Sequence, residues 1–177
     1  MTNEAVLKWA ESLCLATLSA ESKDNFVDKH FGYSDREIVS DSDLIHRCVK
    51  EHGGKKQASA FIVSREEAMK LIRDSLTDSY TVKTITKWAN DWSTGKELIL
   101  EFDVDKVIGK MFAQAKWHEW NAGTAQCSVI RIVLSKDERE WLHPGRNFFV
   151  KTAYPIMNEE DFKATQRKAV EYRRAAM

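Results

Sequence analysis

The chain has 177 residues, of which 43% are hydrophobic and 31% are charged, and its 27 basic residues balance its 27 acidic ones. This globular composition excludes a disordered, collagen-like or disulfide-stapled chain. A net charge of zero excludes a whole-molecule field that gathers nucleic acid, so any anion site must be local.

The length is that of one compact domain, for which roughly 100–200 residues are usual. Three cysteines lie far apart, without the spacing of a metal site: Cys14, Cys48 and Cys127. We interpret them as reduced, partly buried cysteines of a protein that works in a cytosolic environment. Charged residues interrupt the apolar positions of the first twenty residues, so we expect neither a signal peptide nor membrane insertion by this domain.

Helices are expected in the first half of the chain. Residues 2–21 carry apolar side chains at helical spacing behind a cap at Thr2 or Asn3. Two S-x-x-E capping boxes, which begin at Ser34 and Ser64, predict two further helices because serine caps one amide and glutamate reaches back to another.

Residues 81–92, TVKTITKWANDW, form a fourth helical candidate whose apolar face extends to Trp92. The tail from residue 158 to 177 has acidic residues first and basic residues last, which suits the dipole of a terminal helix.

Strand patterns follow Gly95. Residues 97–104, 127–134 and 147–153 are short, β-branched and aromatic, and residues 106–110 add a brief fourth candidate. Pro155 is expected to end the last strand. Helices first and strands second favour an α+β fold with a small antiparallel twisted sheet and an extra C-terminal helix.

The usual signatures of metal and nucleophile chemistry are missing. No H-E-x-x-H motif, zinc-finger spacing, nucleophile elbow or Gly-rich phosphate loop occurs in the sequence. One alternative remains open, a metal-dependent hydrolase that uses His46, His118 or His143. Otherwise the sequence indicates acid–base chemistry without metal or cofactor.

Two segments carry candidate acid–base residues, and each also has a structural interpretation. His30, in DKHFGYSDRE, is either a functional histidine or a loop histidine that packs beside Phe31. Arg47 is either an anion-binding residue or a solvated charge on a helix.

The segment FFVKTAYPI, residues 148–156, ends with two hydroxyl groups. Alternation along a strand places Thr152 and Tyr154 on one face, together with Phe148 and Val150. Two hydroxyls at i and i+2 can both reach one oxyanion. The alternative is a surface threonine and a tyrosine that packs over the following proline.

Five segments, in chain order, resemble a known family. KHFGYSDREIV resembles the His-x-Gly-x-Ser/Thr-Asp segment that opens the ribonuclease A-like toxin domains of bacterial contact-dependent growth inhibition proteins. ASAFIVSREEAMKLI resembles their Ala-Ser-x-Phe segment, and KWANDW resembles their tryptophan helix. ELILEFDVDKVIGK is similar to the strand before their Val-Gly-Arg/Lys turn, and FFVKTAYP to their terminal strand. The resemblance covers roughly residues 28–156.

Carried over position by position, the family's catalytic histidine falls on His30 and its hydroxyl pair on Thr152 and Tyr154. Its arginine falls best on Arg47, which requires extra residues after the histidine, and Arg36 is the alternative.

The resemblance implies metal-independent RNA cleavage by attack of the ribose 2′-hydroxyl, which leaves a 2′,3′-cyclic phosphate. His30 would be the general base. Arg47, Thr152 and Lys151 would bind the charge that grows on the phosphate. Tyr154 would position the phosphate, stack a base or assist the leaving oxygen.

The resemblance also implies a domain organisation and partners. We expect an N-terminal helix over residues 1–27, the toxin domain over 28–156 and a C-terminal helix over 157–177, all in one compact unit. RNA is the expected substrate, with Trp117 and Trp120 offering faces for base stacking. A cognate immunity or antitoxin protein, action in the bacterial cytoplasm and delivery from a secreted parent protein are further expectations. The alternative is a non-catalytic immunity or regulatory protein that keeps a toxin-like sheet.

Overall fold

The computed structural model describes residues 1–21, 26–31, 39–50, 57–113, 125–137, 145–158 and 160. The elements in chain order are α1 (Asn3–Ser12), α2 (Leu15–Glu21), α3 (Phe26–Phe31), α4 (Asp41–Lys50), β1 (Gln57–Phe61), α5 (Arg65–Thr77), α6 (Ser79–Asn90), β2 (Glu97–Asp103), β3 (Gly109–Ala113), β4 (Ala125–Cys127), β5 (Val129–Lys136) and β6 (Phe148–Ile156).

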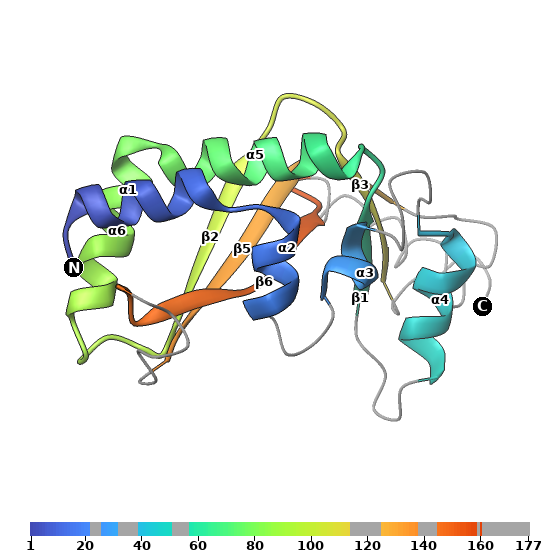
Figure 1. Cartoon of the computed structure of the whole chain (residues 1–177). Helices are drawn as coiled ribbons and strands as arrows, with labels where there is room; N and C mark the ends of the chain where they lie inside the picture. The colour runs from blue at the N-terminus through green and yellow to red at the C-terminus, as the bar shows by residue number, and fades with distance from the viewer. Residues whose placement is uncertain are drawn as a thin grey trace.

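The described strands form two antiparallel sheets of three strands each, ordered β1-β3-β4 and β2-β5-β6. The expected α+β class is confirmed, but the strands divide between two sheets instead of one. In Figure 1, α1 and α5 run side by side across the direction of β2 and β5, whereas α3 and α4 lie near β1 at the other end of the molecule.

The main core lies between the α1, α5 and α6 helices and the β2-β5-β6 sheet. Phe148 is fully buried there, and the ring centroids of Trp9 and Trp88 lie 4.8 and 5.8 Å from its own. Edge-to-face aromatic contacts of this kind add to the stabilisation from apolar burial. None of the helices in the described part of the chain is long and apolar enough to cross a membrane.

The helix caps expected at Thr2 and Ser64 are present. The Thr2 hydroxyl accepts a hydrogen bond from the amide of Ala5 at 3.2 Å, and the Ser64 hydroxyl accepts one from Glu67 at 3.1 Å. The capping box at Ser34 and the C-terminal helix expected after residue 157 lie outside the described residues, apart from isolated positions.

The prediction of a single helix over residues 2–21 is wrong, because the helix is interrupted between Ser12 and Leu15. Leu13 adopts an extended conformation and is buried. The Thr17 hydroxyl accepts a hydrogen bond from the amide of Cys14 at 2.9 Å, which restarts the chain as α2. Local side-chain bonds of this type compete with continued helix.

The helix over residues 81–92 is confirmed as α6, but its apolar face stops at Ala89. Trp92 lies beyond the C-cap Asp91 and is 57% exposed, so the expected burial of Trp92 is wrong. Trp88, one turn earlier, is buried in the core.

Two strand predictions need correction. The strand expected over 127–134 is two strands, β4 and β5, separated at Ser128. Pro155 does not end β6, which continues to Ile156, and Pro155 pairs with Ile130 in the register. Strand β1, which the sequence patterns did not predict, lies over QASAF.

A β-bulge interrupts β6. The register pairs Val150 with Leu134 and Thr152 with Val133, so Lys151 is an extra residue on its strand. One inserted residue reverses the alternation of every residue beyond it.

The expected common face of β6 is therefore wrong. Phe148, Val150 and Ala153 are buried in the core, whereas Thr152 and Tyr154 are only partly buried and lie on the opposite face. The apolar side chains of the strand therefore face the core, and its two hydroxyl groups lie on the other side of the sheet.

The cysteines differ in their surroundings. Cys14 and Cys127 are free, and Cys14 is exposed, where partial burial was expected. Burial raises the pKa of the Cys127 thiol to about 12, so this thiol stays protonated at neutral pH.

Candidate active site

A pocket of about 270 Å³ opens between α3, α4, β1 and β6. Its lining includes His30, Arg47, Lys151, Thr152 and Tyr154, which are all the predicted site residues that the structure describes. Side chains from four separate elements thus converge on one cavity. Trp117, Trp120 and the alternative Arg36 lie outside the described residues.

The short helix α3 positions His30, where a loop was expected. Phe26 and Phe31 at its two ends are buried, and the Phe31 ring lies 4.7 Å from that of Phe61 on β1. These contacts fix α3 against the β1 strand, and the half-buried His30 projects into the pocket.

A backbone carbonyl group selects the tautomer of His30. Its Nδ1 lies 2.6 Å from the carbonyl oxygen of Ser59 on β1. A carbonyl oxygen only accepts, so Nδ1–H donates, and in the neutral ring Nε2 carries the lone pair. An imidazole held in this way is oriented to take a proton through Nε2.

His30 and Tyr154 are stacked. Their ring centroids lie 5.2 Å apart with an interplanar angle of 24°. The phenol of Tyr154 comes from β6 and the imidazole from α3, so this contact joins the helical side of the pocket to the β2-β5-β6 sheet.

Arg47 is held beside His30 by the end of α3. Its Nη1 donates a hydrogen bond to the carbonyl oxygen of Lys29, the residue before His30. Arginine at the last carbonyls of a helix is also favoured by the helix dipole. His30 and Arg47 are separated by 16 residues in the sequence but line the same pocket in the fold.

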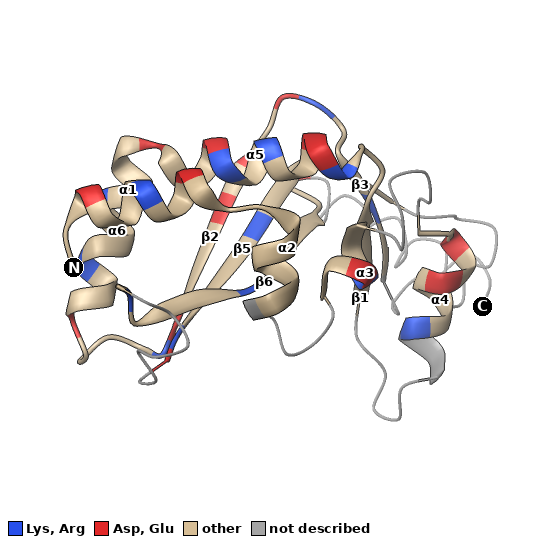
Figure 2. Cartoon of the chain, in the orientation of Figure 1, with Lys and Arg blue, Asp and Glu red and all other residues tan. Residues whose placement is uncertain are grey.

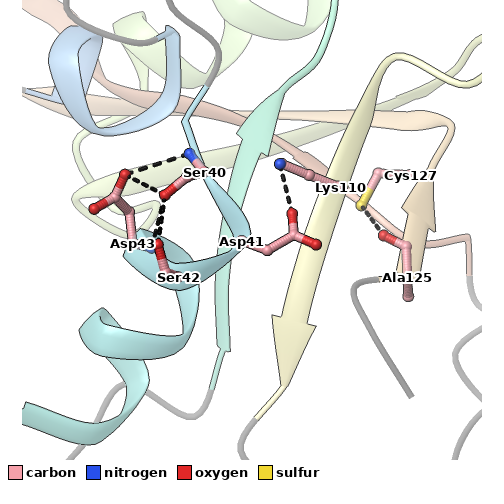
Figure 3. Close-up of polar contacts among 7 residues, drawn as sticks. All are labelled: Ser40, Asp41, Ser42, Asp43, Lys110, Ala125 and Cys127. Carbon is pink, nitrogen blue, oxygen red and sulfur yellow. Dashed lines mark hydrogen bonds and ion pairs between the residues drawn. The ribbon is translucent and has the colours of Figure 1, made fainter. Parts of the chain in front are cut away.

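Helix α4, which carries Arg47, is fixed at its N-terminus (Figure 3). The Ser40 hydroxyl accepts a hydrogen bond from the amide of Asp43 at 3.1 Å, and the Asp43 carboxylate accepts one from the Ser40 hydroxyl at 2.7 Å. Asp41 pairs with Lys110 of β3 at 2.6 Å. The S-x-x-D pattern at Ser40 is a helix-start signal, although the sequence patterns considered above did not predict this helix.

The β-bulge brings Thr152 and Lys151 to the pocket together. Thr152 is turned away from the core by the reversed alternation, and Lys151 lies at the exposed rim, where it pairs with Glu97 of β2. The sequence identified both residues but assigned Thr152 to the wrong face of the strand.

Three residues near the site were not identified from the sequence. Lys29 lines the pocket and Ser59 supplies the carbonyl group that bonds His30. Arg131 of β5 lies beside the ring of Tyr154, with its Cζ 6.0 Å from the ring centroid. Arg131 could have been suspected, because it is the one charged residue within the apolar run CSVIRIVL.

The described residues contain no group of three or more His, Cys, Asp or Glu side chains arranged to hold a metal ion. His46, one candidate of the metal-hydrolase alternative, is exposed on α4, and His118 and His143 lie outside the described part of the chain.

Comparison with protein-family models shows the family to which the chain belongs. The family model of the bacterial CdiA-CT RNase A domain matches residues 26–155, a range that begins before His30 and ends after Tyr154. The chain belongs to this family. The resemblance found in the sequence motifs is therefore confirmed, and the chain is a ribonuclease-type toxin domain of contact-dependent growth inhibition.

The fold agrees with the CdiA-CT family. A solved structure described as the crystal structure of the CdiA-CT/CdiI complex from Y. kristensenii 33638 has a TM-score of 0.54 and 18% sequence identity. The similarity covers 75% of this chain and 98% of that one. At this identity the match shows a shared fold. A comparison with curated proteins gives no significant match.

Proposed function

We propose that this CdiA-CT RNase A domain is a metal-independent endoribonuclease that cleaves RNA by attack of the ribose 2′-hydroxyl on the adjacent phosphate. The observation that carries the proposal is the pocket in which His30, with its tautomer set by Ser59, is stacked on Tyr154 beside Arg47 and Thr152. The products would be a 2′,3′-cyclic phosphate and a free 5′-hydroxyl.

His30 is the general base of this reaction. With Nδ1–H donated to the Ser59 carbonyl oxygen, Nε2 takes the proton of the 2′-hydroxyl and the oxygen attacks phosphorus. An imidazole suits this task, because its ordinary pKa lies close to neutral pH.

Arg47, Thr152 and Lys151 stabilise the phosphate. Negative charge grows on the nonbridging oxygens during attack, and donors already fixed in a partly enclosed pocket stabilise it most. The guanidinium of Arg47 is oriented by the Lys29 carbonyl group, and Thr152 is fixed by the sheet register. Lys151 at the rim, where it is paired with Glu97, adds a further positive charge.

RNA is the substrate of this mechanism, because DNA lacks the 2′-hydroxyl nucleophile. The domain would then act in the bacterial cytoplasm after delivery from a secreted parent protein, and inhibit growth by degrading RNA. The related structure is a complex with CdiI, and we infer that this domain also binds a cognate immunity protein.

The test is incubation of purified protein with total RNA and excess chelator, with analysis of the product ends. Wild type should yield 2′,3′-cyclic phosphate ends. His30→Ala should lose about 10²–10⁴-fold of the rate, the usual contribution of a general base, with an unchanged melting temperature.

His46→Ala is the matched control, since His46 is an exposed histidine next to Arg47. It should keep wild-type activity. RNA cleavage at full rate by His30→Ala, or activity that disappears with chelator, would contradict the proposal. A folded wild type without any RNA cleavage would favour the non-catalytic alternative.

A further inference from the structure

A row of polar side chains crosses the β2-β5-β6 sheet and ends at the pocket. The register pairs Glu101 of β2 with Arg131 of β5, and Arg131 with Tyr154 of β6. Figure 2 shows the same juxtaposition, with acidic segments on β2 beside a basic segment on β5. Residues paired directly across antiparallel strands have side chains on the same face and within reach of each other.

The contacts along the row hold the guanidinium in place. Nε of Arg131 donates to Oε1 of Glu101 at 2.8 Å, and Nη2 donates to the same oxygen at 2.5 Å. Cζ of Arg131 lies 6.0 Å from the centroid of the Tyr154 ring. Two bonds to one carboxylate fix the orientation of an otherwise flexible side chain.

Arg131 remains charged in this position. Burial alone would lower the pKa of its guanidinium, but hydrogen bonding with Tyr154 and Glu101 outweighs burial and raises the pKa above its ordinary value. A permanent positive charge beside Tyr154 can stabilise negative charge that develops on the phenol oxygen during a reaction, because opposite charges attract most where the surroundings are partly buried.

We propose that Arg131, held by Glu101, is a positioning residue that makes Tyr154 the proton donor to the leaving 5′-oxygen. The inference rests on the proposed ribonuclease function and commits Tyr154 to one of its possible roles. Arg131 acts through Tyr154, since Tyr154 lines the pocket and Arg131 is not among the residues of its lining.

Every proton that moves in this reaction step has a donor and an acceptor. Nε2 of His30 takes the proton of the 2′-hydroxyl, O2′ bonds to phosphorus, and the bond from phosphorus to O5′ breaks as Oη of Tyr154 gives its proton to O5′. The enzyme is then left with an imidazolium and a phenolate on stacked rings 5.2 Å apart. Transfer of one proton from imidazolium to phenolate, through water, restores the starting state.

Stabilising the phenolate of Tyr154 requires a positive charge in addition to that of His30. A phenol is a weak acid with an ordinary pKa near 10, so a phenolate formed during the reaction must be stabilised. The imidazolium of His30 supplies one charge on one side of the ring, and Arg131 supplies another from the neighbouring strand.

The test compares two oligoribonucleotides that are identical except at the cleaved linkage. One has the natural 5′-oxygen and the other a 5′-bridging sulfur, which leaves as a thiolate and needs no proton. With the oxygen substrate, Arg131→Met should lower the rate constant of cleavage at least about tenfold, part of the 10²–10⁴-fold that a general acid contributes. With the sulfur substrate the same variant should stay within about twofold of wild type.

Three further variants separate positioning from folding. Arg131→Lys should recover part of the loss, and Glu101→Gln should show the same dependence on the leaving atom while preserving side-chain shape. Tyr154→Phe should show the largest dependence on the leaving atom. Adding Arg131→Met to it should cost little more on the oxygen substrate, because residues that act as one unit are non-additive.

Lys70→Met is the matched control, since it breaks an exposed ion pair with Asp74 on α5 and should leave both rates unchanged. Equal slowing of both substrates by Arg131→Met and Glu101→Gln, or full additivity with Tyr154→Phe, would overturn the inference and leave the ribonuclease function standing. Absence of RNA cleavage by wild type would instead overturn the ribonuclease function.

Discussion

His30 and Arg47 are both held by backbone carbonyl groups. The Ser59 carbonyl oxygen accepts from Nδ1 of His30, and the Lys29 carbonyl oxygen accepts from the Arg47 guanidinium. The backbone of α3 and β1 therefore helps to set the positions of both side chains. Substitution of Ser59 by alanine would keep the carbonyl group and should be tolerated, although its side chain is buried.

Arg47→Lys tests the need for a guanidinium. Lysine keeps the charge but carries all its donors on one nitrogen, so it cannot bind the Lys29 carbonyl oxygen and a phosphate through separate nitrogens in fixed directions, as the planar guanidinium can. We expect kcat to fall about 10²-fold, as for loss of one preorganised donor, with a smaller change in KM. Steady-state kinetics on a defined oligoribonucleotide measures both, and an unchanged kcat would contradict the role of Arg47.

At the residue scale, the sequence identified five residues of the pocket and missed three residues in or beside it, Lys29, Ser59 and Arg131. His30, Thr152 and Tyr154 stand in recognisable local motifs, whereas Ser59 contributes only a carbonyl group and Arg131 acts from another strand. A backbone oxygen has no sequence signature, and contacts between strands depend on a register that local patterns do not specify.

Helix α4 shows how one element sets the site. Its N-terminal bonds at Ser40 and its ion pair from Asp41 to Lys110 hold the helix against β1 and β3, and Arg47 lies at its other end. Loss of the contacts at the start of α4 should therefore shift Arg47, which lies two turns later and lines the pocket.

Ser40→Ala should lower the free energy of unfolding by about 1 kcal/mol, the usual cost of losing an N-cap side chain. Denaturant unfolding measures this change. We also expect RNA cleavage to fall more than with Ser64→Ala, which removes the cap of α5. Equal activity of the two variants would show that the α4 cap does not position Arg47.

The pH dependence of this cap has a definite sign. The hydrogen bond from the Ser40 hydroxyl is the main cause that holds the pKa of Asp43 below its ordinary value. A carboxylate with a lower pKa in the folded state stabilises the fold above its unfolded pKa, near 3.9, and this contribution disappears as pH falls through the folded pKa. Asp43→Asn should therefore destabilise the protein at pH 7 more than at pH 3, as measured by thermal melting at both values.

The strand β6 shows why element-level prediction failed. Its extent was nearly right, but its faces were wrong beyond Val150, because regular alternation cannot anticipate a bulge. The proline, expected to stop the strand, lies within it. Proline lacks an amide donor, so it is tolerated in a strand where no ladder bond needs that donor.

The two sheets meet at Gly109 and Pro155. A Cβ atom at Gly109 of β3 would lie 2.3 Å from Cγ of Pro155 on β6 and 2.8 Å from the carbonyl oxygen of Ala60 on β1. Neither a proline ring nor a backbone carbonyl group can move aside at low cost. The pocket spans the same junction, with Ser59 on one sheet and Tyr154 on the other.

Gly109→Ala should therefore separate the sheets and destabilise the protein by about 1–3 kcal/mol, as overpacking does. Activity should fall as well, because His30 is bonded to one sheet and stacked on the other. Gly95→Ala is the matched control, since its nearest outside neighbour would be an oxygen at 3.9 Å. Thermal melting and RNA cleavage measure both variants, and similar results for the two would contradict the role of this junction.

At the scale of the molecule, the order of helices and strands was enough to predict the α+β class. The division of six strands into two sheets was not predictable, because it depends on pairings between segments far apart in the chain, such as β1 with β3. One core nevertheless contains residues from α1 and from β6, near the two ends of the described chain.

The extra residue in β6 makes it possible to change the length of the strand without changing the face on which its other side chains lie. Val150 and Thr152 already pair with consecutive residues of β5, so deletion of Lys151 would restore regular pleating and leave every other side chain pointing where it points now. We expect that deletion variant to fold and to cleave RNA more slowly than wild type, because only the rim charge of Lys151 is lost. One alanine inserted between Thr152 and Ala153 should abolish cleavage, because it rotates Tyr154 toward the core. For this strand, the pleat position of Tyr154 matters more than strand length, and the extra residue adds a charge at the rim without changing the face on which the two hydroxyl groups lie.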